Sequence, residues 1–177
     1  MIRRAFYLIA YLIFAELVEA AITPQLKFVV PQQWEFVFDF YLLALAGILA
    51  GCLWGHWLGM GIAVLAAALN GFSQDPGLLG ASIVGYTPAA YLAGSWGPKL
   101  RGASTSFQWF GLFILLCVAV WCQMLVRQLF WEITPFNIFP AVTTLLMVAI
   151  TAGFGVVLIR WAPMTPRRKT RFKTKPS

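Results

Sequence analysis

The sequence predicts an all-α, polytopic integral membrane protein with six transmembrane helices and both termini in the cytoplasm. Of its 177 residues, 60% are hydrophobic and only 11% are charged. Soluble domains carry roughly 45–50% apolar and about 25% charged residues. Because so few charges could not cover so much apolar surface in water, we expect the chain in a bilayer, as a single domain.

Six apolar segments approach the length of about 20 residues that crosses the hydrocarbon core of a membrane. In chain order they cover residues 5–23, 36–54, 57–72, 78–94, 107–130 and 140–161. We expect helices throughout, because lipid offers no partners to unpaired backbone groups. The third segment is short, which predicts a tight turn around residues 55–61 between the second and third helices.

The first segment follows Arg3 and Arg4 and resembles a signal peptide. Two glutamates, Glu16 and Glu19, interrupt its apolar run. We therefore interpret it as an uncleaved first span.

The distribution of charge predicts the orientation. An even number of spans puts both chain ends on one side of the membrane, which then holds eleven of the thirteen basic residues. They are Arg3, Arg4, Lys99, Arg101, Arg160, Arg167, Arg168, Lys169, Arg171, Lys173 and Lys175. The opposite loops hold Lys27, Glu35, Asp75 and Glu132. Since positive residues mark the cytoplasmic face, we expect a multi-pass protein of the bacterial cell (inner) membrane with cytoplasmic ends.

Residues 1–163 form the predicted six-helix domain, and residues 164–177 form a basic cytoplasmic tail. The tail lacks an apolar periodicity, which is typical of a disordered segment. One interpretation is adhesion to membrane lipids, where each basic residue contributes up to about 1 kcal/mol near an anionic leaflet. The other is a docking site for an acidic cytoplasmic partner.

Four glycines recur every four residues in GILAGCLWGHWLG, which covers residues 47–59. They are Gly47, Gly51, Gly55 and Gly59. Glycines at this spacing share one helix face and let two backbones approach closely, which matters in lipid because little hydrophobic drive acts between helices. We predict a helix-packing surface, either for a partner protein or for this chain's own helices. Small residues in the fourth span, from Ala81 to Gly94, make that span a possible neighbour.

The same stretch holds Cys52 and His56, one helical turn apart. Zinc sites need three or four ligands, and no other Cys, His or acidic residue has a matching spacing. We therefore expect no metal site and no cofactor, with His56 solvated in the cytoplasmic turn. No catalytic motif is present either, so the sequence does not predict an enzyme.

Charged residues inside predicted spans are rare, usually paired and functional by default. Glu16 and Glu19 share a face in the outer half of the first span, and Arg127 lies at a similar depth in the fifth. One interpretation is a proton or substrate site. The other, which the depth of the charges favours, is a structural ion pair that holds the first span against the fifth.

The middle of the chain carries a characteristic order of features. Pro31 precedes the second span, glycines follow at 55, 59 and 61, LAAALNGFSQDPGLLG ends the third span, and SIVGYTPAAYLAG forms the fourth. This order resembles the bacterial rod-shape-determining protein MreD family, in which Asp often stands where this chain has Asn70. The resemblance implies a non-enzymatic member of the cell-elongation machinery. Its expected partner is MreC, and through MreC the MreB filament and the peptidoglycan synthases.

A second family has a similar size, six helices and the same orientation. It is the substrate-binding S-component of energy-coupling-factor vitamin transporters. These components typically dock through an A-x-x-x-A pattern in the first span. Here the residues four after Ala5, Ala10 and Ala15 are Ile, Phe and Glu, so the pattern is absent and the first resemblance is preferred.

Overall fold

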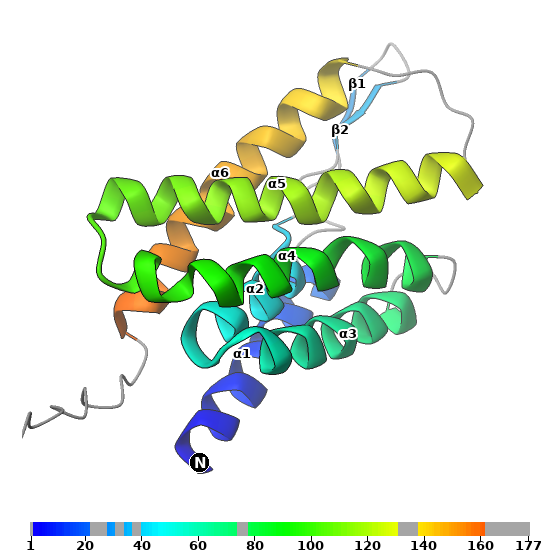
Figure 1. Cartoon of the computed structure of the whole chain (residues 1–177). Helices are drawn as coiled ribbons and strands as arrows, with labels where there is room; N and C mark the ends of the chain where they lie inside the picture. Colours follow the sequence, from blue (N-terminus) through cyan, green and yellow to red (C-terminus); the bar gives the residue numbers. More distant parts are fainter. Residues whose placement is uncertain are drawn as a thin grey trace, which may run out of the picture.

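The apolar segments of the sequence fold into helices, as expected of segments whose backbone groups must be satisfied locally. A computed structural model of the chain describes residues 2–21, 28–30, 34–36, 40–73, 78–130 and 138–161. The helices are α1 (Ile2–Ala21), α2 (Leu42–Trp54), α3 (His56–Ser73), α4 (Leu78–Arg101), α5 (Thr105–Phe130) and α6 (Ile138–Trp161) (Figure 1). The prediction of a helical fold is thus confirmed.

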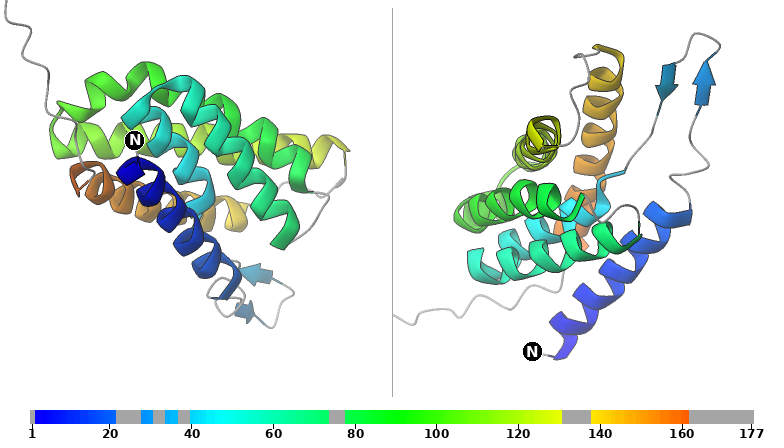
Figure 2. Two further views of the ribbon diagram at one scale, coloured as in Figure 1. Left: turned by 90° about the horizontal axis from the view of Figure 1, so that it is seen from below. Right: turned by 90° about the vertical axis from the view of Figure 1, so that its right-hand side faces the viewer.

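A short antiparallel ribbon is an addition to the predicted all-α fold. Strand β1 (Phe28–Val30) pairs with β2 (Trp34–Phe36), with Phe28 opposite Phe36. Its aromatic and β-branched residues are types that favour strands. The ribbon projects beyond the end of α1, on the side of the molecule where α6 begins (Figures 1 and 2).

Two helices are long and apolar enough to cross a membrane, over Thr105–Leu129 in α5 and Ala141–Trp161 in α6. Two further apolar helices, Leu42–Trp54 and His56–Gly71, are shorter. By length and composition, α5 and α6 could therefore cross a membrane.

Two predicted helix boundaries were wrong, and the predicted tight turn between α2 and α3 is shorter than expected. Helix α2 begins at Leu42 and not at residue 36, because residues 34–36 form β2 and Tyr41 has a left-handed backbone with φ of 47°. Helix α4 continues to Arg101 and not to residue 94. Gly94 and Gly97 lie within the helix, where they allow close contact with other helices, and do not end it. The turn between α2 and α3 is a single residue, Gly55, whose φ of 103° favours glycine.

Helix α2 forms the centre of the bundle. Every residue from Leu42 to Cys52 is buried. Helices α3, α4 and α5 lie side by side in that order, while α6 crosses α5 at an angle (Figures 1 and 2). Helix α1 packs on α2 and α3, and its Phe14 ring lies 6.2 Å from the ring of Phe154 in α6. All five other helices contact α2. The position of this helix therefore depends on each of its neighbours.

The two ends of the helical chain lie on the same side of the bundle. Helix α1 begins and α6 ends at the end of the molecule where the α2–α3 turn and the α4–α5 connection also lie (Figures 1 and 2). The ribbon and the start of α6 lie at the other end.

Candidate functional site

The buried start of α2 receives a carboxylate from α1. The Oε1 atom of Glu19, a residue only 7% exposed, accepts a hydrogen bond of 2.8 Å from the backbone N–H of Leu43. The first N–H groups of a helix have no partner within the helix, and the helix dipole favours negative charge there. Tyr41 at the N-cap makes no side-chain cap, so Glu19 supplies this function from another helix.

Two more side chains hold the same junction. The Tyr11 hydroxyl of α1 donates to the carbonyl oxygen of Leu42 at 3.0 Å. The Thr151 hydroxyl of α6 donates to the carbonyl of Phe40. Helices α1 and α6 are therefore both tied to the start of α2 by polar contacts, in a region that is otherwise packed with apolar side chains.

Glu16 lies one helical turn before Glu19 and is half-buried. Its Oε2 atom is buried and has no hydrogen-bond partner among the described residues. The structure thus distinguishes the two glutamates: Glu19 caps α2, and Glu16 does not share that contact.

The other end of α2 is met by a cation. The guanidinium of Arg101, at the end of α4, donates to the carbonyl oxygen of Leu53 at 3.4 Å and to that of Gly97 at the same distance. A positive charge at a helix C-terminus complements the helix dipole. A short central helix with no charged residue of its own is therefore matched by opposite charges from α1 and α4.

Arg127 is exposed in the last turn of α5. Helix α5 packs on α4, α6 and α2, whereas α1 packs on α2 and α3. The contact of Glu19 with Leu43 was not expected from the sequence. The proposed pairing of Glu16 or Glu19 with Arg127 stays a prediction.

A double-mutant cycle tests that pairing. If the charges interact, Arg127→Leu should lower the stability in detergent, and a Glu16→Gln or Glu19→Gln change in the same chain should restore part of the loss. Residues in contact typically show coupling energies of about 0.5 kcal/mol or more. Additive effects measured by thermal unfolding would contradict the pairing.

The glycine ladder packs against helices of this chain. A Cβ atom added at Gly47 would lie 2.7 Å from the Cβ of Ala63 in α3. One added at Gly51 would lie 3.1 Å from the Cβ of Ala93 in α4, and one added at Gly59 would lie 2.6 Å from the Cα of Gly51. Contacts this tight need glycine at the interface. Gly55 differs from the other three, since it forms the α2–α3 turn with open space around it.

Helix α4 contributes the matching small residues. Cβ atoms added at Gly94 and Gly97 would collide with the backbones of His56 and Cys52, respectively. The fourth span is thus a neighbour of the glycine ladder, as its own small residues suggested.

The side chains of Cys52 and His56 have separate surroundings. Cys52 is buried, while His56 is half-buried and its ring lies 5.4 Å from the rings of Trp57 and Tyr91. Among the described residues, no group of three or more His, Cys, Asp or Glu side chains could hold a metal ion. The basic tail at residues 164–177 lies outside the described residues.

A buried polar cluster joins α3, α4 and α5. The Nδ2 atom of Asn70 donates to the hydroxyls of Ser82 at 3.0 Å and Tyr86 at 3.2 Å, and the Nε2 atom of Gln123 donates to Ser82 at 2.9 Å. These residues were not predicted from the sequence to form a site. Ser82 and Tyr86 are one helical turn apart, so the sequence indicates that they share a face of α4. Their partners on α3 and α5 could not be predicted, because those contacts depend on tertiary packing.

We expect Ser82→Ala to destabilise the bundle by about 1–3 kcal/mol, because it removes an acceptor shared by the buried amide of Asn70 and the half-buried amide of Gln123. The change should appear as a lower midpoint of thermal unfolding in detergent. Ser95→Ala, at an exposed position of the same helix, is the matched control and should have little effect. Equal midpoints for both variants would show that the cluster does not stabilise the fold.

No family model, curated protein or solved structure matches this chain.

Proposed function

We propose that the protein is a non-enzymatic, six-span component of the bacterial cell membrane that takes part in cell elongation, like the MreD family that it resembles. In this proposal it binds MreC and, through MreC, the MreB filament and the peptidoglycan synthases. It thereby helps to maintain cell shape and to direct wall synthesis.

The observation that carries the membrane part of this proposal is the separation of charge along the bundle. Helices α1 and α6 have their chain-terminal ends on one side of the molecule, where Lys99 and Arg101 of α4 and Arg160 of α6 also lie. The sequence predicts eleven of the thirteen basic residues on that side. Positive charge on one side is typical of the cytoplasmic face of a membrane protein. The apolar composition of α5 and α6 supports the same placement.

The polar contacts within the bundle support a non-enzymatic, structural role. The contacts of Glu19, Arg101 and Asn70 all join one helix of this chain to another. Such contacts favour a rigid bundle that presents its outer surface to partners. The order of features over residues 31–100, which resembles that of the MreD family, supports a role in cell elongation.

A reporter fused after Ser177 tests the topology. With six spans and a cytoplasmic C-terminus, we expect activity from a reporter that works in the cytoplasm and none from one that requires the periplasm. The reverse pattern would contradict the six-span arrangement.

Copurification in mild detergent tests the function itself. We expect MreC or a penicillin-binding protein to be retained by the tagged chain and lost when the chain is replaced by an unrelated membrane protein of similar size. Retention of a pair of ATPases would instead identify the S-component of a vitamin transporter and contradict the proposal.

A further inference from the structure

In the part of the chain that the structure describes, the end of the bundle where α4 and α6 end carries basic residues and no acidic residue. Glu16 and Glu19 lie in the second half of α1, and Glu35 lies in β2. Lys99, Arg101 and Arg160, at the ends of α4 and α6, therefore have no carboxylate side chain of the described residues at their own end of the bundle.

A buried glutamine links the helix ends that carry two arginines of this end, and we call this junction of α4, α5 and α6 the corner. Gln108 of α5 is 3% exposed, and its Nε2 atom donates to the carbonyl oxygen of Leu100 at 3.0 Å. Its Oε1 atom accepts from the Nε atom of Arg160 in α6 at 3.4 Å. Arg101 follows Leu100 directly, so Gln108 links the segments of α4 and α6 that carry the two arginines.

The guanidinium groups of this corner are exposed and bind only neutral acceptors among the described residues. Arg101 donates to two backbone carbonyls, and Arg160 donates to Gln108 and to the hydroxyl of Thr105. A guanidinium has five N–H donors in a planar fork that fits the oxygens of a phosphate. Both groups therefore keep donors and a full positive charge for an external anion.

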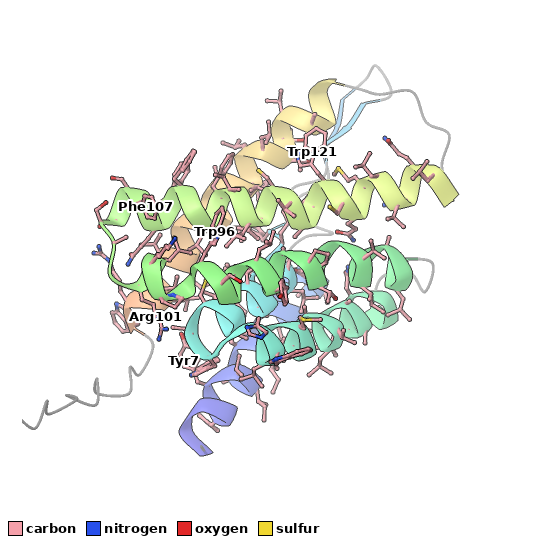
Figure 3. The ribbon with its side chains drawn as sticks, viewed as in Figure 1. Tyr7, Trp96, Arg101, Phe107 and Trp121 are labelled. Carbon is pink, nitrogen blue, oxygen red and sulfur yellow. The ribbon has the colours of Figure 1, made fainter. Side chains whose placement is uncertain are left out.

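Large aromatic side chains are exposed on the same helix ends as the two arginines. Trp161 follows Arg160 directly and is 82% exposed, while Trp96 and Phe107 are partly exposed near the ends of α4 and α5 (Figure 3). Tryptophan beside basic residues is typical of the level of lipid headgroups, where the ring is half in hydrocarbon and the charge meets phosphate. An acidic soluble partner would explain the charges but not these exposed rings.

We propose that this corner binds the phosphate groups of anionic phospholipids, with Arg101 and Arg160 as the contacts and Gln108 as the residue that positions Arg160. The inference rests on the membrane placement proposed above, and it is independent of any role in cell elongation. It concerns the folded end of the bundle and not the tail at residues 164–177.

The test uses the full chain purified in an uncharged detergent and titrated with phosphatidylglycerol or phosphatidylcholine. Bound lipid is measured by native mass spectrometry. A basic residue near an anionic surface contributes about 1 kcal/mol, which corresponds to roughly fivefold in affinity. We expect about fivefold weaker binding of phosphatidylglycerol for Arg101→Gln and for Arg160→Gln, and roughly 25-fold weaker binding for the double variant.

Three controls make the test specific. Lys27→Gln removes one positive charge that the sequence places at the other end, and it should leave binding unchanged. Arg160→Lys retains the charge and should lose less affinity than Arg160→Gln. Gln108→Leu removes no charge but should weaken binding, because Arg160 loses its partner. Raising the salt from about 0.1 to 1 M shortens the screening length from about 10 to 3 Å and should weaken binding.

Several results would overturn the proposal. Equal affinity for phosphatidylcholine and phosphatidylglycerol would show that the corner does not recognise the anionic headgroup. If inorganic phosphate protected the protein from thermal unfolding as well as phosphatidylglycerol does, the ligand would be a soluble anion. If the folded Arg160→Gln variant bound phosphatidylglycerol with unchanged affinity, the corner would not be the binding site. This result would count even if Arg101→Gln failed to fold. A periplasmic C-terminus in the reporter experiment would instead overturn the six-span arrangement with this end in the cytoplasm, which separates the two failures.

Discussion

Gly51→Leu should prevent assembly of the helical bundle. Gly51 lies where three helices meet, and a Cβ atom there would be 3.1 Å from the Cβ of Ala93 and 3.2 Å from the backbone nitrogen of Gly94. Gly59 of α3 is also close, since a Cβ atom added there would lie 2.6 Å from the Cα of Gly51. Overpacking by a few carbon atoms costs about 1–3 kcal/mol in a well-packed core, and here the obstacle is backbone that cannot move aside. The expected result is loss of the folded monomer peak in size-exclusion chromatography in detergent.

Gly61→Leu is the matched control for Gly51→Leu. It is an exposed glycine of α3 with open space around its Cα, so the same side chain should be tolerated. His56→Ala should also be far less damaging than Gly51→Leu, because the His56 ring is half-buried at the surface of the bundle. A folded Gly51→Leu protein, or a bound metal lost on His56→Ala, would contradict the interpretation of this stretch as a packing surface.

Glu19→Ala should lower the free energy of unfolding by about 2–3 kcal/mol. The substitution leaves the buried N–H of Leu43 without its acceptor and removes the negative charge from the start of α2. Glu19→Gln keeps an acceptor oxygen but not the charge, so it should lose only about 1 kcal/mol. Thermal or denaturant unfolding in detergent measures both changes.

Glu16→Ala is the control for Glu19→Ala, since it removes a carboxylate of the same helix that does not cap α2. We expect it to affect stability less than Glu19→Ala does. If the two alanine variants were equally destabilised, the loss would reflect a general requirement for acidic residues in α1. The specific contact with Leu43 would then not explain the stability.

The sequence was informative wherever a local property determined the structure. Apolar composition predicted helices, and the four-residue glycine spacing predicted close packing, which the contacts of Gly47 and Gly51 with α3 and α4 now describe. Glycine spacing specifies a face that permits close approach. It does not specify which helix approaches, so the sequence left a partner protein and this chain's own helices as alternatives.

The sequence was less informative about polar contacts between distant segments. Glu19 is 24 residues from Leu43, and nothing in either local pattern shows that one caps the other. A helix start is usually recognised from a Ser, Thr, Asp or Asn at the cap, and here a tyrosine in a left-handed conformation occupies that place. The start of α2, predicted at residue 36, was also wrong because it depends on contacts between distant segments. Its apolar aromatic residues fit a helix and a strand equally well, and tertiary pairing of β1 with β2 decided between them.

The shortness of α2 has a consequence for how the protein is made. Thirteen residues of helix extend about 20 Å, whereas the hydrocarbon core of a bilayer is about 30 Å thick. In the proposed membrane arrangement, α2 cannot reside in lipid alone, because its terminal N–H and C=O groups would lack partners. Its C-terminal partner Arg101 belongs to α4, which leaves the ribosome after α2. Biogenesis must therefore hold the newly made α2 in a protected environment until α3 and α4 have been synthesised and can enclose it.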